Sequence, residues 1–472
     1  MTTNFIKTFS SNISYSFISH LLVFFLGVIR AFVVPVMLGV IDFGYWQFYV
    51  LYVGFVGVFT FGFNDGIYLR YGGQEVDELP WKKLRGSFCF YIATLCFISI
   101  VLFVVLGLVD LSKEKVISFV YIIISIGLTG IGSLYIFLFQ VTNRIKKYSV
   151  YNLIDKLFFL LMLSLVYFYM ADYNFKYLML IDCLSKFFLV VMMSIDCRNH
   201  IFGSIESFLL SWSEYYANIG AGIKLMLANL VAMLIISISR FFVEFYFTIE
   251  EFSIFAFGLA LTNLALIAVN GVSAVLYPAF KQIDQEKYKE IYEVLSDVIT
   301  VTIFILFFTY YPIYYIVLNH LPDFKEVLPF FNILLVISLL QIKINLSINT
   351  FYKVLRKEKE LLKANIICLI LVIFLSLLVV MLNKKLEFIA LATLLPLIFR
   401  IYSTDRFIKN LLGSHDNNKL VFEFSLITIF ILVTNYLSVS SSLFVLLIFF
   451  IFFIYFHIKH IQTWLNLLKG IR

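Results

Sequence analysis

Residues 13–39 read ISYSFISHLLVFFLGVIRAFVVPVMLG, an apolar run that contains a single charged side chain, Arg30. A helix needs roughly 20 apolar residues to cross the hydrocarbon core of a bilayer, so this run is long enough to span one. It is too long for the apolar part of a secretion signal, and no small-residue cleavage site follows it. The run therefore predicts a retained membrane-spanning helix near the start of the chain.

The whole chain has the same character as this run. Of its 472 residues 62% are hydrophobic and only 14% are charged, and the mean hydropathy is +0.97. Soluble domains carry roughly 25% charged residues, so this composition excludes a water-soluble protein as well as disordered, collagen-like and disulfide-scaffold classes. With 7 Pro and 21 Gly, long helices are favoured. We expect an all-α polytopic membrane protein.

Apolar segments of spanning length recur along the chain. We predict about 14 transmembrane helices, within a range of 12–14, with the short segment 386–403 and the last two segments least distinct. The predicted spans are 13–39, 44–63, 87–109, 116–139, 150–170, 177–195, 222–243, 252–276, 292–318, 328–351, 364–382, 386–403, 420–438 and 441–457.

Lys and Arg are distributed unevenly between the two sets of connecting segments. With the N-terminus inside, the inner segments hold 23 of them and the outer loops hold 6. Cytoplasmic loops carry such an excess, so both termini are predicted to be cytoplasmic, which an even number of spans also requires. Every loop is short, the longest being roughly 196–221, so no extramembrane domain is predicted.

Two short patterns recur about 210 residues apart. The run Asp42-Phe43-Gly44-Tyr45-Trp46 resembles 251–255, and Arg30 precedes the first pattern as Arg240 precedes the second. A second pair of similar segments, 144–152 and 357–365, is separated by nearly the same number of residues. An even number of spans separates the copies, so the two halves have the same orientation. We predict an N-terminal six-helix lobe over 1–210, a C-terminal six-helix lobe over 211–405, and a C-terminal helix pair with a cytoplasmic tail over 406–472.

Several short motifs resemble a known family in order and spacing over about residues 13–410. The first half has Phe43-Gly44-Tyr45, Phe61-Gly62-Phe63 and Leu69-Arg70-Tyr71, and the second has Ala228-Asn229-Leu230 and Val275-Leu276-Tyr277-Pro278. Together they resemble the Wzx-type polysaccharide-unit flippases of the multidrug/oligosaccharidyl-lipid/polysaccharide exporter superfamily. Where that family often has an Asp-Arg pair, this chain has Ser239-Arg240.

The resemblance implies two lobes around a central cavity, often cationic, that work by alternating access. It implies a flippase that moves an undecaprenyl-diphosphate-linked oligosaccharide from the cytoplasmic to the periplasmic face of the bacterial inner membrane. Such a unit enters O-antigen, capsule or a related polymer, so other polysaccharide assembly proteins are candidate partners besides membrane lipids. Coupling to an H⁺ or Na⁺ gradient is implied, and no cofactor, metal or nucleic acid is expected.

Charged side chains inside spans are costly and are functional candidates by default. An anionic diphosphate head needs cations and hydrogen bonds along its path, and Arg suits phosphate oxygens best because its donors form a planar fork. The candidate substrate-binding residues are Arg30, Arg240, Lys343, Lys186, Gln341 and Asn345. Arg400 is interpreted as an anchor near the cytoplasmic end of its span.

Four further residues are candidates for gating or coupling. Asp182 precedes Lys186 by four residues, a spacing that is typical of an intrahelical ion pair, and Asp182 is alternatively a coupling-ion site. Asn64, Asp65 and Arg70 follow the second span and either guard an inward opening or form a solvated cap.

Two rival functions stay open at this point. A drug or small-cation antiporter of the same superfamily would use buried carboxylates, whereas the deep charges here are mostly Arg and Lys. A polysaccharide polymerase or ligase would need a sizeable periplasmic loop, and none is predicted. P-loop, HExxH and GxSxG motifs are absent from the sequence, so the chain is expected to be a transporter and not an enzyme.

Overall fold

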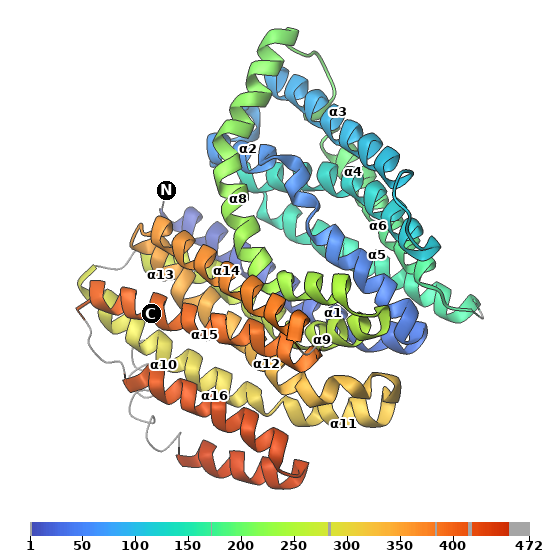
Figure 1. The fold of residues 1–472 in the computed structure, drawn as a ribbon. Coiled ribbons are helices and arrows are strands. Elements are labelled where there is room, and N and C mark those ends of the chain that lie inside the picture. The colour runs from blue at the N-terminus through green and yellow to red at the C-terminus, as the bar shows by residue number, and fades with distance from the viewer. Residues whose placement is uncertain (1, 171, 282–284, 383–384, 414–417, 453–472) are drawn as a thin grey trace. The chain divides into compact units, whose positions relative to one another are not determined.

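The computed structural model describes residues 2–170, 172–281, 285–382, 385–413 and 418–452. Within these ranges it does not describe the side chains of 2–20, 145, 267–279, 281, 418 and 419. In the described ranges every regular element is helical and none is a strand (Figure 1). The all-α fold predicted from composition is therefore confirmed, while the predicted cytoplasmic tail falls largely outside the described residues.

The chain divides into two compact units, Met1–Met233 and Leu234–Arg472, and the division falls inside one helix, α8. The finer boundaries predicted at 210 and 405 stay a prediction. Unit 1 contains α1 (Thr2–Gly54), η1 (Val56–Thr60), α2 (Phe63–Tyr71), η2 (Val76–Glu78), α3 (Trp81–Leu106), α4 (Lys113–Val141), α5 (Ile145–Tyr169), α6 (Phe175–Asp196), α7 (Arg198–Ile201) and the first part of α8 (Phe208–Tyr246).

Unit 2 contains the end of α8 and all later elements. They are α9 (Ile249–Lys281), η3 (Gln285–Lys287), α10 (Tyr288–Phe307), α11 (Tyr310–His320), η4 (Pro322–Val327), α12 (Leu328–Lys343), η5 (Ile344–Ile348), α13 (Asn349–Val354), α14 (Glu358–Leu382), α15 (Leu386–Leu411) and α16 (Asn418–Tyr436). A last apolar helix covers Val439–Phe452.

The number of spans agrees with the prediction. Among the described residues, 11 helical stretches are long and apolar enough to cross a membrane, and two shorter apolar helices follow them. The first stretch holds two helices, because Gly39 lies between them in a left-handed conformation with φ 67°. Counting those two separately reaches the predicted fourteen, so the chain is a multi-pass membrane protein.

Two predicted loops are wrong in part, because helices extend into them. Helix α8 begins at Phe208 inside the predicted loop 196–221, where Phe208 and Trp212 pack their rings against Phe90. Helix α15 continues to Leu411 through the predicted loop 404–419. The hydropathy pattern placed the helix ends at polar residues. Apolar packing extends α8, and ion pairing extends α15.

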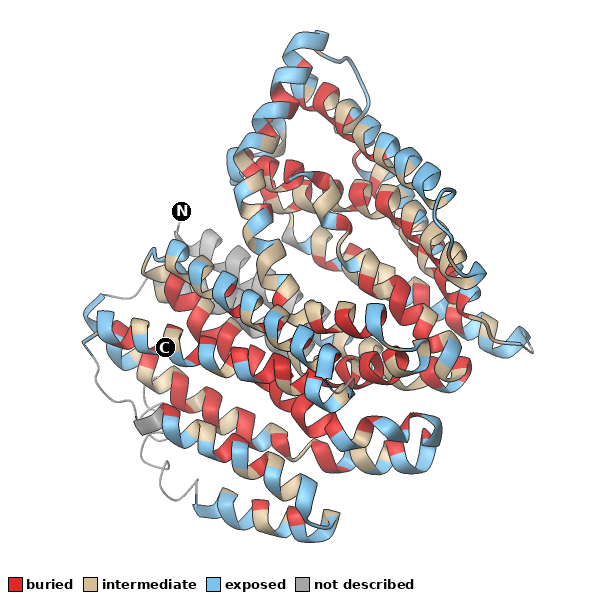
Figure 2. Cartoon of the chain, in the orientation of Figure 1, coloured by how far each residue is buried: buried red, intermediate tan, exposed pale blue. Residues whose placement is uncertain are grey.

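Each unit has a core helix that its neighbours surround. In unit 2 this is α12, in which every residue from Phe330 to Lys343 is buried (Figure 2). Its sequence is apolar on all sides, the pattern of a helix that is enclosed by other helices. In unit 1, α4 packs against α1, α3, α5 and α6 and supplies much of the buried cluster. The polar residues on these core helices are therefore held inside protein.

Candidate functional site

Helices α2 and α8 approach each other closely within unit 1 because glycines line the contact. A Cβ atom at Gly66 would lie 1.8 Å from the carbonyl oxygen of Asn218, and one at Gly222 would lie 2.0 Å from the carbonyl oxygen of Gly62. Only residues without a side chain permit such an approach. Gly62 also has φ 77°, a backbone conformation that glycine adopts without strain.

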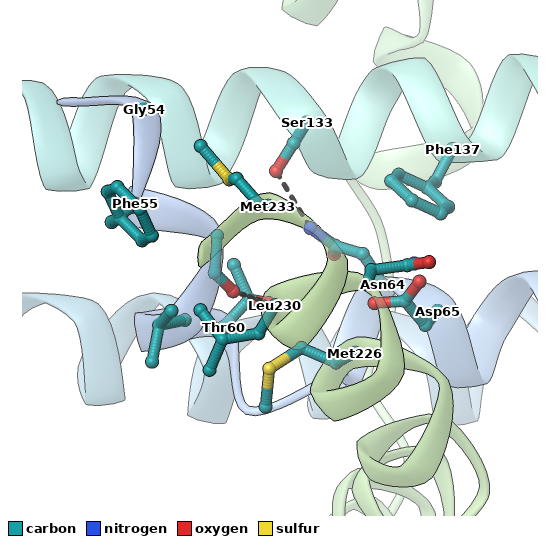
Figure 3. Close-up of a pocket in the computed structure, with 13 residues that line it drawn as sticks. Gly54, Phe55, Thr60, Asn64, Asp65, Ser133, Phe137, Met226, Leu230 and Met233 are labelled. Atoms are coloured by element: carbon teal, nitrogen blue, oxygen red, sulfur yellow. Dashed lines mark hydrogen bonds between the residues drawn. The ribbon is translucent and has the colours of Figure 1, made fainter. Parts of the chain in front are cut away.

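A cavity of about 240 Å³ lies beside this crossing, within unit 1 (Figure 3). Residues from the end of α1, η1 and the start of α2 form one wall, and α4 and α8 form the others. The lining residues are Gly54, Phe55, Gly57, Val58, Thr60, Asn64, Asp65, Ser133, Phe137, Met226, Asn229, Leu230 and Met233. The cavity is mainly apolar, with a few polar groups and one carboxylate, Asp65.

Two of the predicted gate residues, Asn64 and Asp65, lie in this cavity wall. Asn64 is 2% exposed, and its Nδ2 donates to Ser133 Oγ at 2.8 Å and to Tyr91 Oη at 3.2 Å. Its Oδ1 is buried and accepts no hydrogen bond from any described group. Burial raises the pKa of the neighbouring Asp65 carboxyl above its ordinary value. The wall thus offers an acceptor and a titratable acid.

The third predicted gate residue, Arg70, lies at the far end of α2. Its Nη1 donates to Glu214 Oε1 and to Asn218 Oδ1 of α8, both at 2.5 Å. Glu214, which is 8% exposed, also accepts from Tyr71 at 2.7 Å. Arg70 is thus not a simple solvated cap, because it joins α2 to α8 through a half-buried ion pair.

Arg30 lies among α1, α5 and α6 of unit 1. Its guanidinium carbon is 4.8 Å from the centre of the Trp46 ring and 4.4 Å from that of Phe159. Within the described part of the chain, no hydrogen bond or ion pair holds this guanidinium. Aromatic faces stabilise a cation by roughly 0.5–2 kcal/mol without using its N–H donors. Those donors are thus left available.

Asp182 and Lys186 on α6 complete a polar cluster with Arg30. The two form the expected ion pair, and Tyr49 Oη donates to Asp182 Oδ2 at 2.6 Å. Ser125 of α4 is 2.6 Å from the same Tyr49 oxygen. The structure therefore brings together three predicted residues from α1 and α6 and links them to α4.

The remaining predicted residues lie in unit 2. Lys343 is 1% exposed and forms an ion pair with Glu423 of α16. Gln341 is buried with its Nε2 unpaired among the described groups, and Asn345 accepts from Asn349 at 3.3 Å. Arg240 of α8 is partly buried.

Sequence reasoning missed several buried polar groups. Glu423 went unnoticed although it is an acid inside an apolar span, which was a usable signal. Asp405 and Lys409 were placed in a loop, but both are buried and paired at 3.0 Å, and their spacing of four residues was the signal. Arg400 is not an exposed anchor: it is 3% exposed, and its Nε has no hydrogen-bond partner in the described structure.

Metal binding finds no support in the ranges that the structure describes. They contain no group of three or more His, Cys, Asp or Glu side chains that could hold a metal ion. The five cysteines, Cys89, Cys96, Cys183, Cys197 and Cys368, are all free.

The chain matches no protein-family model and no curated protein, but it matches solved structures. The lipid II flippase MurJ, in an inward-closed conformation, aligns with a TM-score of 0.65 and 11% identity over 95% of this chain and 98% of its own. The MATE transporter VcmN of Vibrio cholerae aligns with a TM-score of 0.54 and 12% identity over 89% of this chain and 99% of its own.

The fold is that of MurJ and the MATE transporters. A further MATE structure, in complex with MaL6, gives a TM-score of 0.52 at 10% identity, over 86% of this chain and 96% of its own. At identities this low the likeness establishes the fold, and substrate must be argued from the residues.

Proposed function

We propose that this protein is a flippase for an undecaprenyl-diphosphate-linked oligosaccharide, moving it from the cytoplasmic to the periplasmic face by alternating access. The fold it shares with a lipid II flippase supports a lipid-linked substrate. We place the protein in the bacterial inner membrane with both termini cytoplasmic, where enzymes that assemble O-antigen, capsule or a related polymer are its partners.

The observation that carries this proposal is the state of Arg30. Its charge is balanced by the Trp46 and Phe159 ring faces and by the nearby Asp182 carboxylate, with no direct ion pair. An arginine held in this way keeps its fork of N–H donors free for phosphate oxygens. A lipid-linked diphosphate supplies two phosphate groups of this kind.

The neighbouring Asp182 is our candidate for the coupling-ion site. It touches Lys186 and Tyr49 and lies close enough to Arg30 to interact electrostatically. Protonation or binding of Na⁺ at Asp182 would change the charge next to the phosphate-binding group. This links ion binding to substrate binding in one cluster. Asn64, Asp65 and Arg70 are proposed to act as the gate where α2 meets α8.

One observation favours the rival drug or small-cation antiporter. Asp65 is the one charged residue that lines the cavity of unit 1, beside two phenylalanines and two methionines. A carboxylate among aromatic and thioether groups suits a lipophilic cation better than a diphosphate. The flippase therefore depends mainly on Arg30, whereas the antiporter depends mainly on Asp65.

The test uses a strain in which the gene is deleted and variants are supplied on a plasmid. Surface polysaccharide and accumulated lipid-linked unit are measured for Arg30→Ala, Arg30→Lys and Asp65→Asn. Lys363→Ala is the matched control, because it removes an exposed cation that pairs with Glu360 on its own helix. Uptake of the cationic dye ethidium into the same cells tests the antiporter.

A flippase predicts that deletion stops polymer export and that Arg30→Ala lowers it by about tenfold or more, with partial recovery in Arg30→Lys. Lys363→Ala should match the wild type. Normal polymer in the deletion strain would refute the flippase. Normal polymer in Arg30→Ala alone would remove only the role given to Arg30. Dye retention that rises on deletion and in Asp65→Asn would favour the antiporter.

A further inference from the structure

Glu423, on helix α16 of the C-terminal pair, is enclosed by helices of unit 2. Its Oε2 pairs with Lys343 Nζ of α12, and its Oε1 accepts from Thr300 Oγ1 of α10. The Glu423 side chain is 11% exposed and that of Lys343 is 1% exposed. We propose that Glu423 is a proton-binding site at which the bound proton and the contact with Lys343 exclude each other.

The surroundings of this pair are apolar and nearly dry. A cavity of about 20 Å³ adjoins the carboxylate, and its other lining residues are Thr300, Ile303, Phe304, Phe307, Leu340, Leu426 and Ile427. A space of roughly 10–15 Å³ is enough for one water molecule when polar partners are present, as Glu423 and Thr300 are here. The site can therefore hold a single water that carries a proton to the carboxylate.

A polar face of α10 connects this site to the other end of the unit. Tyr292, Ser296 and Thr300 are spaced by four residues and so lie on one face, over roughly 12 Å. Thr300 Oγ1 is also 2.9 Å from the carbonyl oxygen of Ser296, so its single proton points either to that oxygen or to Glu423. Tyr292 Oη donates to Asp405 Oδ1 at 2.6 Å. Asp405 pairs with Lys409 at the end of α15.

This row of groups leads toward the ends of α10 and α15 that we predict to be cytoplasmic. There, Lys289 Nζ donates to the carbonyl oxygen of Gly413 at 3.0 Å. Chains of carboxylates and hydroxyls through an apolar bundle are typical of proton paths in membrane transporters. Here the groups form two separate hydrogen-bonded sets on that face, Thr300 with Glu423 and Tyr292 with Asp405, and a proton would pass between the sets by way of water.

The ligand is a proton and not a metal cation because both carboxylate oxygens already have a partner, Lys343 at Oε2 and Thr300 at Oε1. At Asp182, by contrast, the contacts that the structure describes are made to Oδ2. Protonation converts the Glu423 carboxylate to a neutral acid while Lys343 keeps its charge, so the pair changes from neutral to a net charge of one. An unpaired buried charge costs several kcal/mol, so the lysine must leave the contact when the proton binds.

The helix that carries Lys343 has a feature suited to such a movement. Lys343 is the last residue of α12, directly before the π-helical turn η5, and π-turns occur often at functional sites. The titratable and charged groups on these helices are Lys343 on α12, Tyr288, Lys289, Glu290, Tyr292, Glu293 and Asp297 on α10, and Glu387, Arg400, Tyr402, Asp405, Arg406 and Lys409 on α15. Of these, Lys343 is the group in direct contact.

The experiment needs only protons and no transported substrate, so its outcome is independent of the proposed flippase function. Infrared difference spectra of the purified full chain in lipid are recorded between about pH 4 and pH 9, where protonated carboxyl groups give a resolved C=O band. We compare the wild type, Glu423→Gln, Lys343→Met and the double variant. Glu360→Gln is the control, because it removes an exposed carboxylate on α14 and leaves this site intact.

We expect the wild type to gain a buried carboxyl band on acidification that Glu423→Gln lacks and Glu360→Gln keeps. In Lys343→Met the band should persist to a pH at least about one unit higher, because the competing cation is gone. The double variant should fold and show no such band, since it replaces the pair by neutral groups of similar size. The proposal would be overturned if the spectra of Glu423→Gln superimposed on those of the wild type and the spectra of the double variant superimposed on those of Lys343→Met.

Discussion

Replacing Gly222 by alanine tests the helix crossing that forms one wall of the cavity. The new Cβ would lie 2.0 Å from the carbonyl oxygen of Gly62 and 2.3 Å from the amide nitrogen of Gly66. Cβ contacts under 3.0 Å do not occur, so at least one ångström of separation between α2 and α8 is required. Both opposing atoms belong to the backbone and cannot rotate away.

Gly220 provides the matched control two residues earlier on α8, because a Cβ there meets nothing within 4 Å. Alanine in a helix is favoured over glycine by about 1 kcal/mol, so Gly220→Ala should stabilise the protein by up to that amount. Overpacking a tight contact costs about 1–3 kcal/mol, so Gly222→Ala should destabilise it. The two variants should differ by about 2–4 kcal/mol.

The assay is the apparent midpoint of thermal unfolding of each purified variant in detergent, followed by the loss of the monodisperse peak in size-exclusion chromatography. We expect the order Gly220→Ala, wild type, Gly222→Ala from most to least stable. If Gly222→Ala is as stable as Gly220→Ala, the close approach of α2 and α8 is wrong, and so is the cavity wall that depends on it.

Three other predictions each concern one residue outside the predicted membrane spans. Arg70→Ala should lower stability by about 1–3 kcal/mol because it strands the buried Glu214 carboxylate, and adding Glu214→Gln should restore part of it in a double-mutant cycle of unfolding midpoints. Burial raises the pKa of Asp65 in the folded state above its unfolded value of about 3.9. The wild type should therefore lose stability relative to Asp65→Asn as the pH rises from the unfolded pKa through the folded pKa. Equal profiles of stability against pH for the two proteins would contradict this. Burial raises the pKa of Cys197 to about 11, so its alkylation by maleimide at neutral pH should be slow in the folded protein and fast in dodecyl sulfate.

Much of the fold could be predicted from the sequence because the bilayer imposes a simple rule. A spanning helix must satisfy its own backbone and present apolar side chains, so length and hydropathy identify it. This rule located the run around Arg30 and the later spans. It failed at Phe208, which packs against Phe90 far away in the chain, and at Asp405, which pairs with Lys409 four residues on and accepts a hydrogen bond from Tyr292.

The candidate site could be predicted only in part. The spacing of Asp182 and Lys186 predicted their ion pair, since four residues place both side chains on one helix face. No local pattern indicates that Tyr49 joins them or that Arg30 lies between two aromatic rings. The contact between Asp182 and Tyr49, for example, joins residues that are 133 positions apart in the chain.

By itself the sequence determined that the protein lies in a membrane, that it is built of many helices of spanning length, and which side chains carry charge within them. Tertiary structure decided which of those charges are already satisfied. Lys343 has an acid that neutralises it directly, and Arg30 has aromatic faces that leave its donors free. The physical reason is that the cost of a buried charge depends on its nearest neighbours, and in a bundle of helices most of those neighbours come from other helices.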